Sequence, residues 1–346
     1  MFDTAGFDAH ERLVHVHDAA SGLKAIIAVH STVRGPAVGG CRMMPYASLD
    51  AARDDALRLS RAMTLKTAIC ELPFGGGKSV VIGDPATDKT PALLAALGRA
   101  LNELGGLYQM AEDVGTTVAD MAVIRRTSPY ARGMADARGD PTPATAYGVF
   151  QALQAAVRHR FGGDLGGIHV AVQGLGNVGW RLAGYLAEAG ARLSVADVDG
   201  GRARLAAERW DADVIAPDAI HALAADVFAP CALGGIIDGD GVADLGAPVI
   251  AGGANNQLAD DHAAAALTRA GIVWVPDIVA NAGGVIDLAH EGPDYEAARV
   301  LTDCERIAGI TLDVLERAGA KDRSTLDVAQ DMAQQRVRAT ATRDAA

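Results

Sequence analysis

Two lysines, Lys66 and Lys78, stand twelve positions apart in one short and mostly apolar stretch of the chain. Lysine is scarce in this sequence, because only five of its 31 basic residues are Lys and the others are Arg. An ammonium group can lose its proton when it is desolvated or lies beside another cation, whereas a guanidinium effectively cannot. The pattern predicts a general base or proton shuttle near neutral pH. The alternative is that both lysines are ordinary surface residues.

A triple glycine, Gly75–Gly77, runs directly into Lys78 and Ser79. A phosphate-binding loop ends in a similar way, but that pattern requires glycine at position 72, where this chain has leucine. A nucleotide triphosphatase is therefore not expected. We expect instead that these glycines let the backbone and a ligand approach each other closely.

Helical spacing predicts how Lys66 is positioned. Ser48 is a suitable N-cap for a helix that begins near Leu49, and the buried stripe of this helix continues to Lys66 at its C-terminal end. A buried cation needs an anionic partner, which would be either a substrate carboxylate or a structural ion pair. Just before this helix, the glycine-containing segment 35–42 is expected to be a loop that directs backbone N–H groups at an anion.

Two carboxylates, Glu112 and Asp113, follow a predicted strand that begins at Tyr108. Loops at strand ends commonly carry catalytic side chains, so this is a second candidate position for chemistry. The segment 128–143 is rich in Gly, Pro, Arg and Asp and is predicted to be a linker. A helix over 142–160 would then lead into a second domain.

The second domain carries a G-x-G-x-x-G motif at 174–179, between a predicted strand over 167–173 and a helix that ends at Gly190. The next strand closes on Asp197, 23 positions after the first glycine. This context is typical of a dinucleotide-binding fold, in which the glycines admit the pyrophosphate to the helix N-terminus. Asp197 would bind the adenine ribose hydroxyls, which favours NAD over NADP.

Further strands of this domain end in loops of small residues or asparagine, where a parallel sheet presents its ligand crevice. These loops lie at 231–235, 252–257 and 276–284.

Composition bounds the possible functions. A length of 346 residues, of which half are hydrophobic and 40 are Gly, favours a two-domain, Ala/Gly-rich α/β enzyme. The net charge of −12 argues against a nucleic-acid partner. The sequence shows no signal-peptide pattern and no apolar run of membrane-spanning length, so no membrane partner is expected. Four scattered cysteines without a C-x-x-C motif indicate reduced thiols in the cytoplasm and no zinc site.

Taken together, these motifs resemble the amino-acid dehydrogenase superfamily, and in particular its short members, the leucine, valine and phenylalanine dehydrogenases. The matching segments run in family order over nearly the whole chain: 39–40, 63–66, 75–78, 112–117, 142–149, 174–179, 229–233, 254–257 and 281–285.

The resemblance implies an α/β fold with two domains and a cleft between them. Residues 1–137 would form an α/β substrate-binding and oligomerisation domain, and 138–324 a Rossmann-type doubly wound domain that binds NAD. A C-terminal helix at about 325–346 would pack back on the first domain. The implied reaction is the reversible NAD-dependent oxidative deamination of an L-amino acid to a 2-oxo acid and ammonia. The implied assembly is a homo-oligomer, either a dimer or an octamer.

The resemblance also implies roles for particular residues. Lys78 would activate water for attack on the iminium carbon, and Asp113 would handle the amino group and shuttle protons. The implied substrate-binding residues are Lys66, Gly39, Gly40, Val38, Ala111, Asn255, Val285 and Leu288. The implied cofactor-binding residues are Gly174, Gly176, Asn177, Val178, Gly179, Asp197, Thr145, Ala229, Cys231 and Asn256. No metal ligand is implied.

The substrate is expected to be apolar. Glutamate-specific relatives carry a lysine before the paired glycines, where this chain has Val38, and a polar residue late in the 281–288 loop, where it has Leu288. A side-chain carboxylate left unpaired against these two residues would be costly. Branched-chain and aromatic substrates both remain open. The rival interpretations are a glutamate-type dehydrogenase and a non-catalytic NAD-binding regulatory protein, and the latter would have no need of Lys66, Lys78 and Asp113 together.

Overall fold

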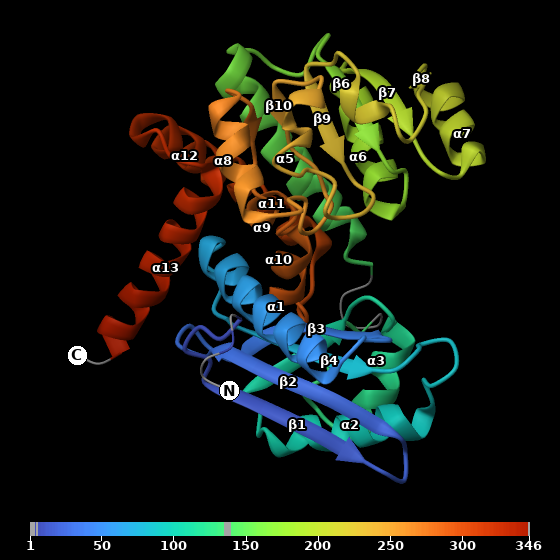
Figure 1. The fold of residues 1–346 in the computed structure, drawn as a ribbon, viewed down its shortest axis with the longest axis vertical. Coiled ribbons are helices and arrows are strands. Elements are labelled where there is room, and N and C mark those ends of the chain that lie inside the picture. The colour runs from blue at the N-terminus through green and yellow to red at the C-terminus, as the bar shows by residue number, and fades with distance from the viewer. Residues whose placement is uncertain (1–3, 5, 135–139, 345–346) are drawn as a thin grey trace. The chain divides into compact units, whose positions relative to one another are not determined.

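The computed structural model describes residue 4, residues 6–134 and residues 140–344 (Figure 1). The chain forms two compact units. The first unit comprises Met1–Gly139, Leu288–Tyr295 and Ala333–Ala346, and the second comprises Asp140–Asp287 and Glu296–Met332.

The first unit is built on a mixed five-stranded sheet in the order β1-β2-β4-β3-β5. Strand β2 pairs antiparallel with β1 and β4, whereas β3 pairs parallel with β4 and β5. Its strands and helices are β1 (Arg12–Asp18), β2 (Leu23–Ser31), β3 (Ala37–Met44), α1 (Leu49–Ile69), β4 (Gly75–Ile82), α2 (Pro91–Glu103), β5 (Tyr108–Glu112) and α3 (Val118–Arg125).

Helices cover both faces of this sheet, α1 on one side and α2 with α3 on the other (Figure 1). Successive side chains of a strand point to opposite faces. In β2, Ile26 therefore packs in the α1 core cluster, whereas Ile27 packs in the cluster that contains α2 and α3. In β4, Val80 lies on the α1 face in the same way, so Lys78, two positions earlier, is on the α1 face too.

The predicted start of the first helix is confirmed. Ser48 is the N-cap of α1, and its side chain accepts a hydrogen bond from Ala51 N at 3.1 Å. Lys66 lies in the last turn of this helix and is half-buried. A capping box between Thr117 and Asp120 likewise starts α3, in agreement with the helix predicted near Val118.

The segment 35–42, predicted as a loop, lies largely in a strand, and the glycines at 75–77, expected to face a ligand, lie in the neighbouring strand. Residues 37–42 lie in β3 and residues 75–79 in β4, side by side in the sheet. The glycines of β4 accommodate protein rather than a ligand. A Cβ at Gly76 would be 2.0 Å from the backbone nitrogen of Thr64 in α1, and a Cβ at Gly77 would be 2.6 Å from the ring of Tyr108. Glycine is required there because helix and ring pack directly on the strand.

The predicted linker also begins later than expected. Residues 128–134 pack into the first unit, because Ala131 is fully buried and Arg132 N donates to Met110 O at 2.6 Å. Residues 135–139 of the predicted linker lie outside the described residues.

The second unit contains a six-stranded, all-parallel sheet in the order β11-β10-β9-β6-β7-β8. Its strands are β6 (His169–Gln173), β7 (Arg192–Ala196), β8 (Asp213–Val214), β9 (Val227–Pro230), β10 (Val249–Ile250) and β11 (Val273–Trp274). The chain runs outward from β6 to β8, returns beside β6, and runs outward again to β11. This is the strand order of the Rossmann fold, in which ligands bind where the direction of winding reverses.

Helices complete the second unit and the chain's C-terminal part. They are α5 (Thr142–Phe161), α6 (Asn177–Glu188), α7 (Gly200–Trp210), α8 (Asp261–Arg269), α9 (Asp277–Ala280), α10 (Gly283–Ala289), α11 (Ala297–Cys304), α12 (Arg306–Lys321) and α13 (Thr325–Asp344), with 3-10 turns at Ile220–Ala222 and Gly241–Asp244. The segment 281–288, predicted as a loop, therefore contains most of α10.

The C-terminal half of α13 belongs to the first unit. Arg336 donates hydrogen bonds to the carbonyl oxygen of Ile69, the last residue of α1. Arg34 reaches the same part of α13, because its Nη1 lies 3.0 Å from Thr340 Oγ1. These contacts attach the end of the chain to the end of α1.

Candidate active site

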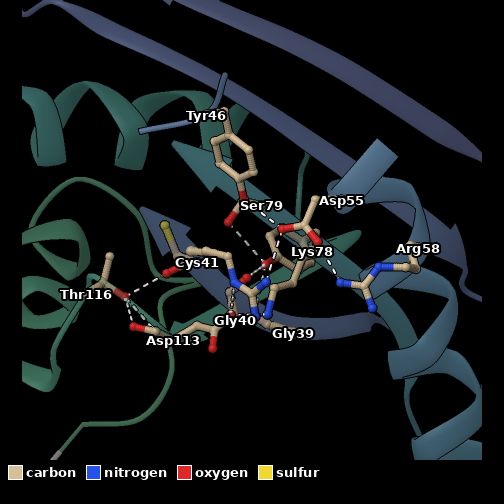
Figure 2. Close-up of polar contacts among 12 residues, drawn as sticks. Gly39, Gly40, Cys41, Tyr46, Asp55, Arg58, Lys78, Ser79, Asp113 and Thr116 are labelled. Atoms are coloured by element: carbon tan, nitrogen blue, oxygen red, sulfur yellow. Dashed lines mark hydrogen bonds and ion pairs between the residues drawn. The ribbon is translucent and has the colours of Figure 1, made fainter. Parts of the chain in front are cut away.

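The centre of the candidate site is an ion pair between Lys78 of β4 and Asp113, which directly follows β5 (Figure 2). Lys78 Nζ donates to Asp113 Oδ2, and only 7% of the lysine side chain is exposed. The loop that carries Asp113 is fixed to β3, since Thr116 Oγ1 accepts from Asp113 N at 3.0 Å and donates to Cys41 O at 2.7 Å. Two residues 35 positions apart thus form one buried acid–base pair.

A second cation, Arg42 of β3, contacts the same carboxylate oxygen. Its Nε lies 3.3 Å from Asp113 Oδ2, and its Nη1 lies 3.1 Å from Asp55 Oδ2 on α1. Asp55 also accepts from Tyr46 at 2.7 Å and from Arg58 at 2.7 Å, as Figure 2 shows. Sequence reasoning missed Arg42 and Asp55. The signal that could have found them is period-two spacing, which sets Arg42 on the same sheet face as Gly40, and the position of Asp55 on the inward stripe of α1.

The charges around Asp113 keep it ionised. Burial would raise the pKa of this carboxyl, but Lys78 and then Arg42 act in the opposite direction, and the pKa lies below its ordinary value. The Cys41 thiol and the Tyr108 hydroxyl are neutral, because burial raises the pKa of the thiol to about 12 and raises that of the hydroxyl as well. Of these three acidic groups only Asp113 is ionised, and it contacts two basic groups, Lys78 and Arg42.

The two glycines of β3 lie directly beside this pair. Tyr108 donates its hydroxyl to Gly39 O at 2.9 Å, and Gly40 is the register partner of Ala111. A Cβ at Gly40 would stand 2.6 Å from the Cβ of Asp113. Gly40 is thus the reason that the Asp113 backbone can approach β3.

The residues expected to bind the substrate belong to two different units. Val38 and Ala111 lie in the first unit on neighbouring strands, and both are buried. Leu288, although remote in sequence, also belongs to the first unit, whereas Val285 and Asn255 belong to the second. The structure therefore brings Val38, Gly39, Gly40, Ala111 and Lys78 together in one sheet, with Asp113 directly after its strand β5.

A buried carboxylate holds the segment that carries Leu288. Glu291 accepts from Arg132 Nε at 2.8 Å and from the backbone nitrogens of Gly133 and Met134 at 3.0 and 3.1 Å. Arg132 in turn donates to Leu288 O at 2.9 Å. Sequence reasoning missed this pair, because the two residues are 159 positions apart.

In the second unit, the G-x-G-x-x-G turn connects β6 to the N-terminus of α6. Gly174 has φ +90°, a conformation that favours glycine, and a Cβ at Gly179 would be 1.9 Å from Gly174 O. A Cβ at Gly176 would meet no atom of the described residues within 4 Å. Gly176 thus leaves space in front of the helix N-terminus, which fits the pyrophosphate of a dinucleotide.

Asp197 closes this turn from the end of β7. Its Oδ2 accepts from Leu175 N at 2.6 Å and its Oδ1 from Asp199 N at 2.8 Å. Asn177 and Val178 form the first turn of α6, as expected for residues beside a bound phosphate.

The other predicted cofactor-contacting residues lie around the same edge of the second sheet. Ala229 is buried in β9, and Cys231 N donates to Gln173 O at 2.7 Å at the end of β6. Burial raises the pKa of the Cys231 thiol to about 11, so this thiol is not a ready nucleophile. Thr145 lies in the first turn of α5, where its hydroxyl donates to Pro141 O at 3.1 Å.

Two further polar residues fix the asparagine pair. Asn281 donates to Asn255 Oδ1 at 2.7 Å, and Asp277 accepts from Asn256 N at 2.7 Å. Asn256 has φ +50°, which is uncommon for a residue other than glycine. Asp277 and Asn281 follow β11, which is the neighbour of β10 in the sheet. A search for polar residues after neighbouring strands could therefore have identified them.

Among the residues that the structure describes, no group of three or more His, Cys, Asp or Glu side chains could hold a metal ion. Within the same residues, no helix combines the length and apolarity needed to cross a membrane.

A Rossmann-type sheet with its glycine-rich turn, together with a second α/β unit that carries a buried lysine–aspartate pair, characterises an oxidoreductase. A family model described as the dimerisation domain of Glu/Leu/Phe/Val dehydrogenases matches residues 10–130. The model of glutamate/leucine/phenylalanine/valine dehydrogenases matches residues 139–204 and 202–338. The chain belongs to this Glu/Leu/Phe/Val dehydrogenase family, and the expected membership is confirmed.

Relatives agree with this assignment. The chain is 45% identical over 341 residues to a leucine dehydrogenase of Thermoactinomyces intermedius, covering 97% of this chain and 93% of that protein. It is 40% identical to a phenylalanine dehydrogenase of the same organism, covering 98% and 93%. The crystal structure of L-tryptophan dehydrogenase from Nostoc punctiforme superposes with a TM-score of 0.86 at 38% identity, covering 96% and 97%. Family members are NAD(P)-dependent amino-acid dehydrogenases, and the expected enzyme class is confirmed.

Proposed function

We propose that this enzyme catalyses the reversible, NAD-dependent oxidative deamination of an apolar L-amino acid to the 2-oxo acid and ammonia. The observation that carries the proposal is the ion pair of Lys78 and Asp113, an amine that is 7% exposed and a carboxylate that is 21% exposed. Relatives named leucine and phenylalanine dehydrogenases support an apolar substrate.

NAD, when bound, accepts the hydride that leaves the substrate Cα. The turn at 174–179 and the N-terminus of α6 would hold its pyrophosphate, and Asp197 its adenine ribose. Asp197 supports NAD over NADP, because a 2′-phosphate would meet a carboxylate of the same charge. Thr145, Ala229, Cys231 and Asn256 are the further residues that we propose contact the cofactor.

Asp113 and Lys78 divide the proton chemistry. Asp113, which is ionised before the substrate binds, would bind the substrate amino group and take up the proton that this group must lose before it becomes an iminium. Lys78 in its neutral form would then accept a proton from the water that attacks the iminium carbon. Asp113 would return its proton to the nitrogen of the resulting carbinolamine. The C–N bond would then break as the hydroxyl group loses its proton to solvent, which gives ammonia and the 2-oxo acid. Lys66, with the backbone around Gly39 and Gly40, would bind the substrate carboxylate, and Asn255 would contact the substrate.

Buried apolar residues would select the substrate. Val38, Ala111 and Leu288 are each less than a tenth exposed, and Val285 is equally buried. A glutamate side chain would leave its carboxylate without a cation against these residues, which is costly. We propose a branched-chain L-amino acid as the first candidate, because identity to the leucine enzyme exceeds identity to the phenylalanine enzyme.

Turnover of a panel of amino acids tests the proposal. Purified enzyme is given NAD with L-Leu, L-Val, L-Ile, L-Phe, L-Trp or L-Glu, and NADH formation is followed by absorbance. We expect turnover of at least one apolar amino acid and none of L-Glu. Lys78→Ala should abolish turnover and retain NAD binding, while Lys24→Ala, at an exposed lysine of β2, should keep wild-type turnover. Turnover by Lys78→Ala would refute the mechanism. NAD binding without turnover of any amino acid would favour the regulatory interpretation.

Two further proposals concern the oligomeric state of the enzyme and its location in the cell. We propose a homo-oligomer, a dimer or an octamer, because the family model over residues 10–130 is described as a dimerisation domain. None of the four cysteines, all of which the structure describes, is in a disulfide, which supports the cytoplasmic location expected from the sequence.

A further inference from the structure

The carboxylate oxygen Oδ2 of Asp113 is shared by two cations, Lys78 and Arg42. In the proposed reaction Lys78 must give up its proton, and the Lys78–Asp113 ion pair then ends. A buried carboxylate that loses its cation is strongly destabilised. Deprotonation of Lys78 is therefore possible only if another group continues to neutralise Asp113.

Arg42 has the properties of that group. A guanidinium cannot be deprotonated in proteins, so its charge is permanent. Its Nη1 is held by Asp55, which is itself held by Tyr46 and Arg58, and only 17% of the arginine side chain is exposed. Arg42 is thus fixed beside Asp113 by α1 and does not depend on Lys78 for its position.

The geometry of Arg42 Nε supports a second position of the carboxylate. This nitrogen is buried and has no aligned hydrogen-bond acceptor among the described residues, although Asp113 Oδ2 is 3.3 Å away. The contact is therefore an ion pair without a hydrogen bond. A buried donor without an acceptor is unfavourable, so a small rotation of Asp113 toward Nε would satisfy it once Lys78 is neutral.

Three other titratable side chains near Lys78 do not offer an alternative charge. Cys41 and Tyr108 are neutral, because burial raises the pKa of each. Asp120, in the first turn of α3, is paired with Lys89 at 2.8 Å. Asp55 forms ion pairs with both Arg42 and Arg58.

We propose that Arg42 is a positioning residue that takes over the Asp113 carboxylate when Lys78 loses its proton, and so allows Lys78 to act as the base. The inference rests on the proposed function for its catalytic meaning. It extends that function by assigning the control of the lysine proton to a residue outside the acid–base pair.

The test compares Arg42→Gln with Arg53→Gln, a matched control at an arginine of α1 that is 21% exposed and pairs with Asp50 and Asp54 instead of Asp55 or Asp113. Without Arg42, Asp113 interacts with Lys78 alone and stabilises its proton. The acid limb of the pH profile of kcat/KM should move to higher pH by about one unit. At neutral pH kcat should fall by up to about tenfold, the factor that a one-unit shift allows, with little change in KM. Arg53→Gln should match the wild type in the position of the acid limb, in kcat and in KM.

A readout independent of turnover accompanies the kinetics. Reductive methylation of Lys78 by formaldehyde, followed by peptide mass spectrometry across a pH series, reports the fraction of neutral amine. The labelling midpoint should rise in Arg42→Gln and stay near the wild-type value in Arg42→Lys, which keeps the charge. If Arg42→Gln does not fold, Asp55→Asn tests the same idea with the opposite sign, because it frees Arg42 for Asp113 and should lower the midpoint.

Equal midpoints and acid limbs in wild type, Arg42→Gln and Asp55→Asn would overturn the proposal. Failure of the proposed function has a different signature. In that case the wild type turns over no amino acid, while the labelling midpoints still decide whether Arg42 controls the Lys78 proton.

Discussion

Gly40 and Asp113 approach so closely that a Cβ on the glycine would lie 2.6 Å from the Cβ of the aspartate. The acid of the buried pair therefore sits against the backbone of β3, where it reaches both Lys78 and Arg42. One missing methyl group thus determines where the carboxylate lies.

Gly40→Ala is expected to displace Asp113 and disconnect it from Lys78. Because proton transfer depends on hydrogen-bond distance, kcat should fall by roughly 100-fold, measured with the preferred amino acid. The control is Gly309→Ala in α12, where a Cβ meets no described atom within 4 Å. That change should leave kcat intact and stabilise the helix by up to about 1 kcal/mol. Wild-type kcat in Gly40→Ala would contradict the crowding argument.

Glu291→Gln should loosen the segment that carries Leu288. The carboxylate is 6% exposed and accepts from Arg132 and two backbone nitrogens, so removing its charge leaves Arg132 poorly compensated. We expect the free energy of unfolding to fall by about 3 kcal/mol, measured by urea titration, and KM for the amino acid to rise. Glu296→Gln breaks an exposed pair with Arg299 and should cost less than about 1 kcal/mol. Equal stability of the two variants would argue against the buried clamp.

Acid should destabilise the first unit through His30. Burial, followed by the neighbouring His10, lowers the pKa of His30 from 6.5 to about 4, and its Nδ1 lies 2.8 Å from Thr64 Oγ1. The unfolded chain binds this proton more readily, so the contribution is complete above pH 6.5 and is lost as pH falls toward 4. The loss amounts to about 3 kcal/mol at most.

The measurement for His30 is the free energy of unfolding across that pH range. His30→Gln should flatten the dependence between these two values, while His15→Gln, on the edge strand β1, should leave it unchanged. A wild-type slope in His30→Gln would show that other groups cause the acid sensitivity.

Asp197→Asn should weaken the preference for NAD. The substitution keeps an acceptor for Leu175 N but removes the charge that a 2′-phosphate would meet. The ratio of kcat/KM for NAD to that for NADP should fall by roughly tenfold, equivalent to about 1.4 kcal/mol. Asp199→Asn, two residues away at the N-cap of α7, retains its cap and should not change the ratio. An unchanged ratio in Asp197→Asn would remove Asp197 from cofactor selection.

Sequence alone determined the elements whose signals are local. The turn at 174–179 was predictable because its glycines, strand and helix are contiguous in the chain. Ser48 and the stripe of α1 were predictable for the same reason, since capping and helical periodicity act within a few residues. Lys78 and Asp113 were identifiable from their residue types and from the resemblance to the family.

Tertiary structure decided which distant residues meet. Arg42 contacts Asp113 across 71 positions, and Arg132 contacts Glu291 across 159. Sheet order, β3 between β4 and β5, created the first contact, and no local pattern encodes that order. The same cause explains the glycines at 75–77. Their composition suggested that a ligand lies beside them, but in the folded protein the space beside them is filled by Thr64 and Tyr108, because side-chain packing between elements is a non-local property.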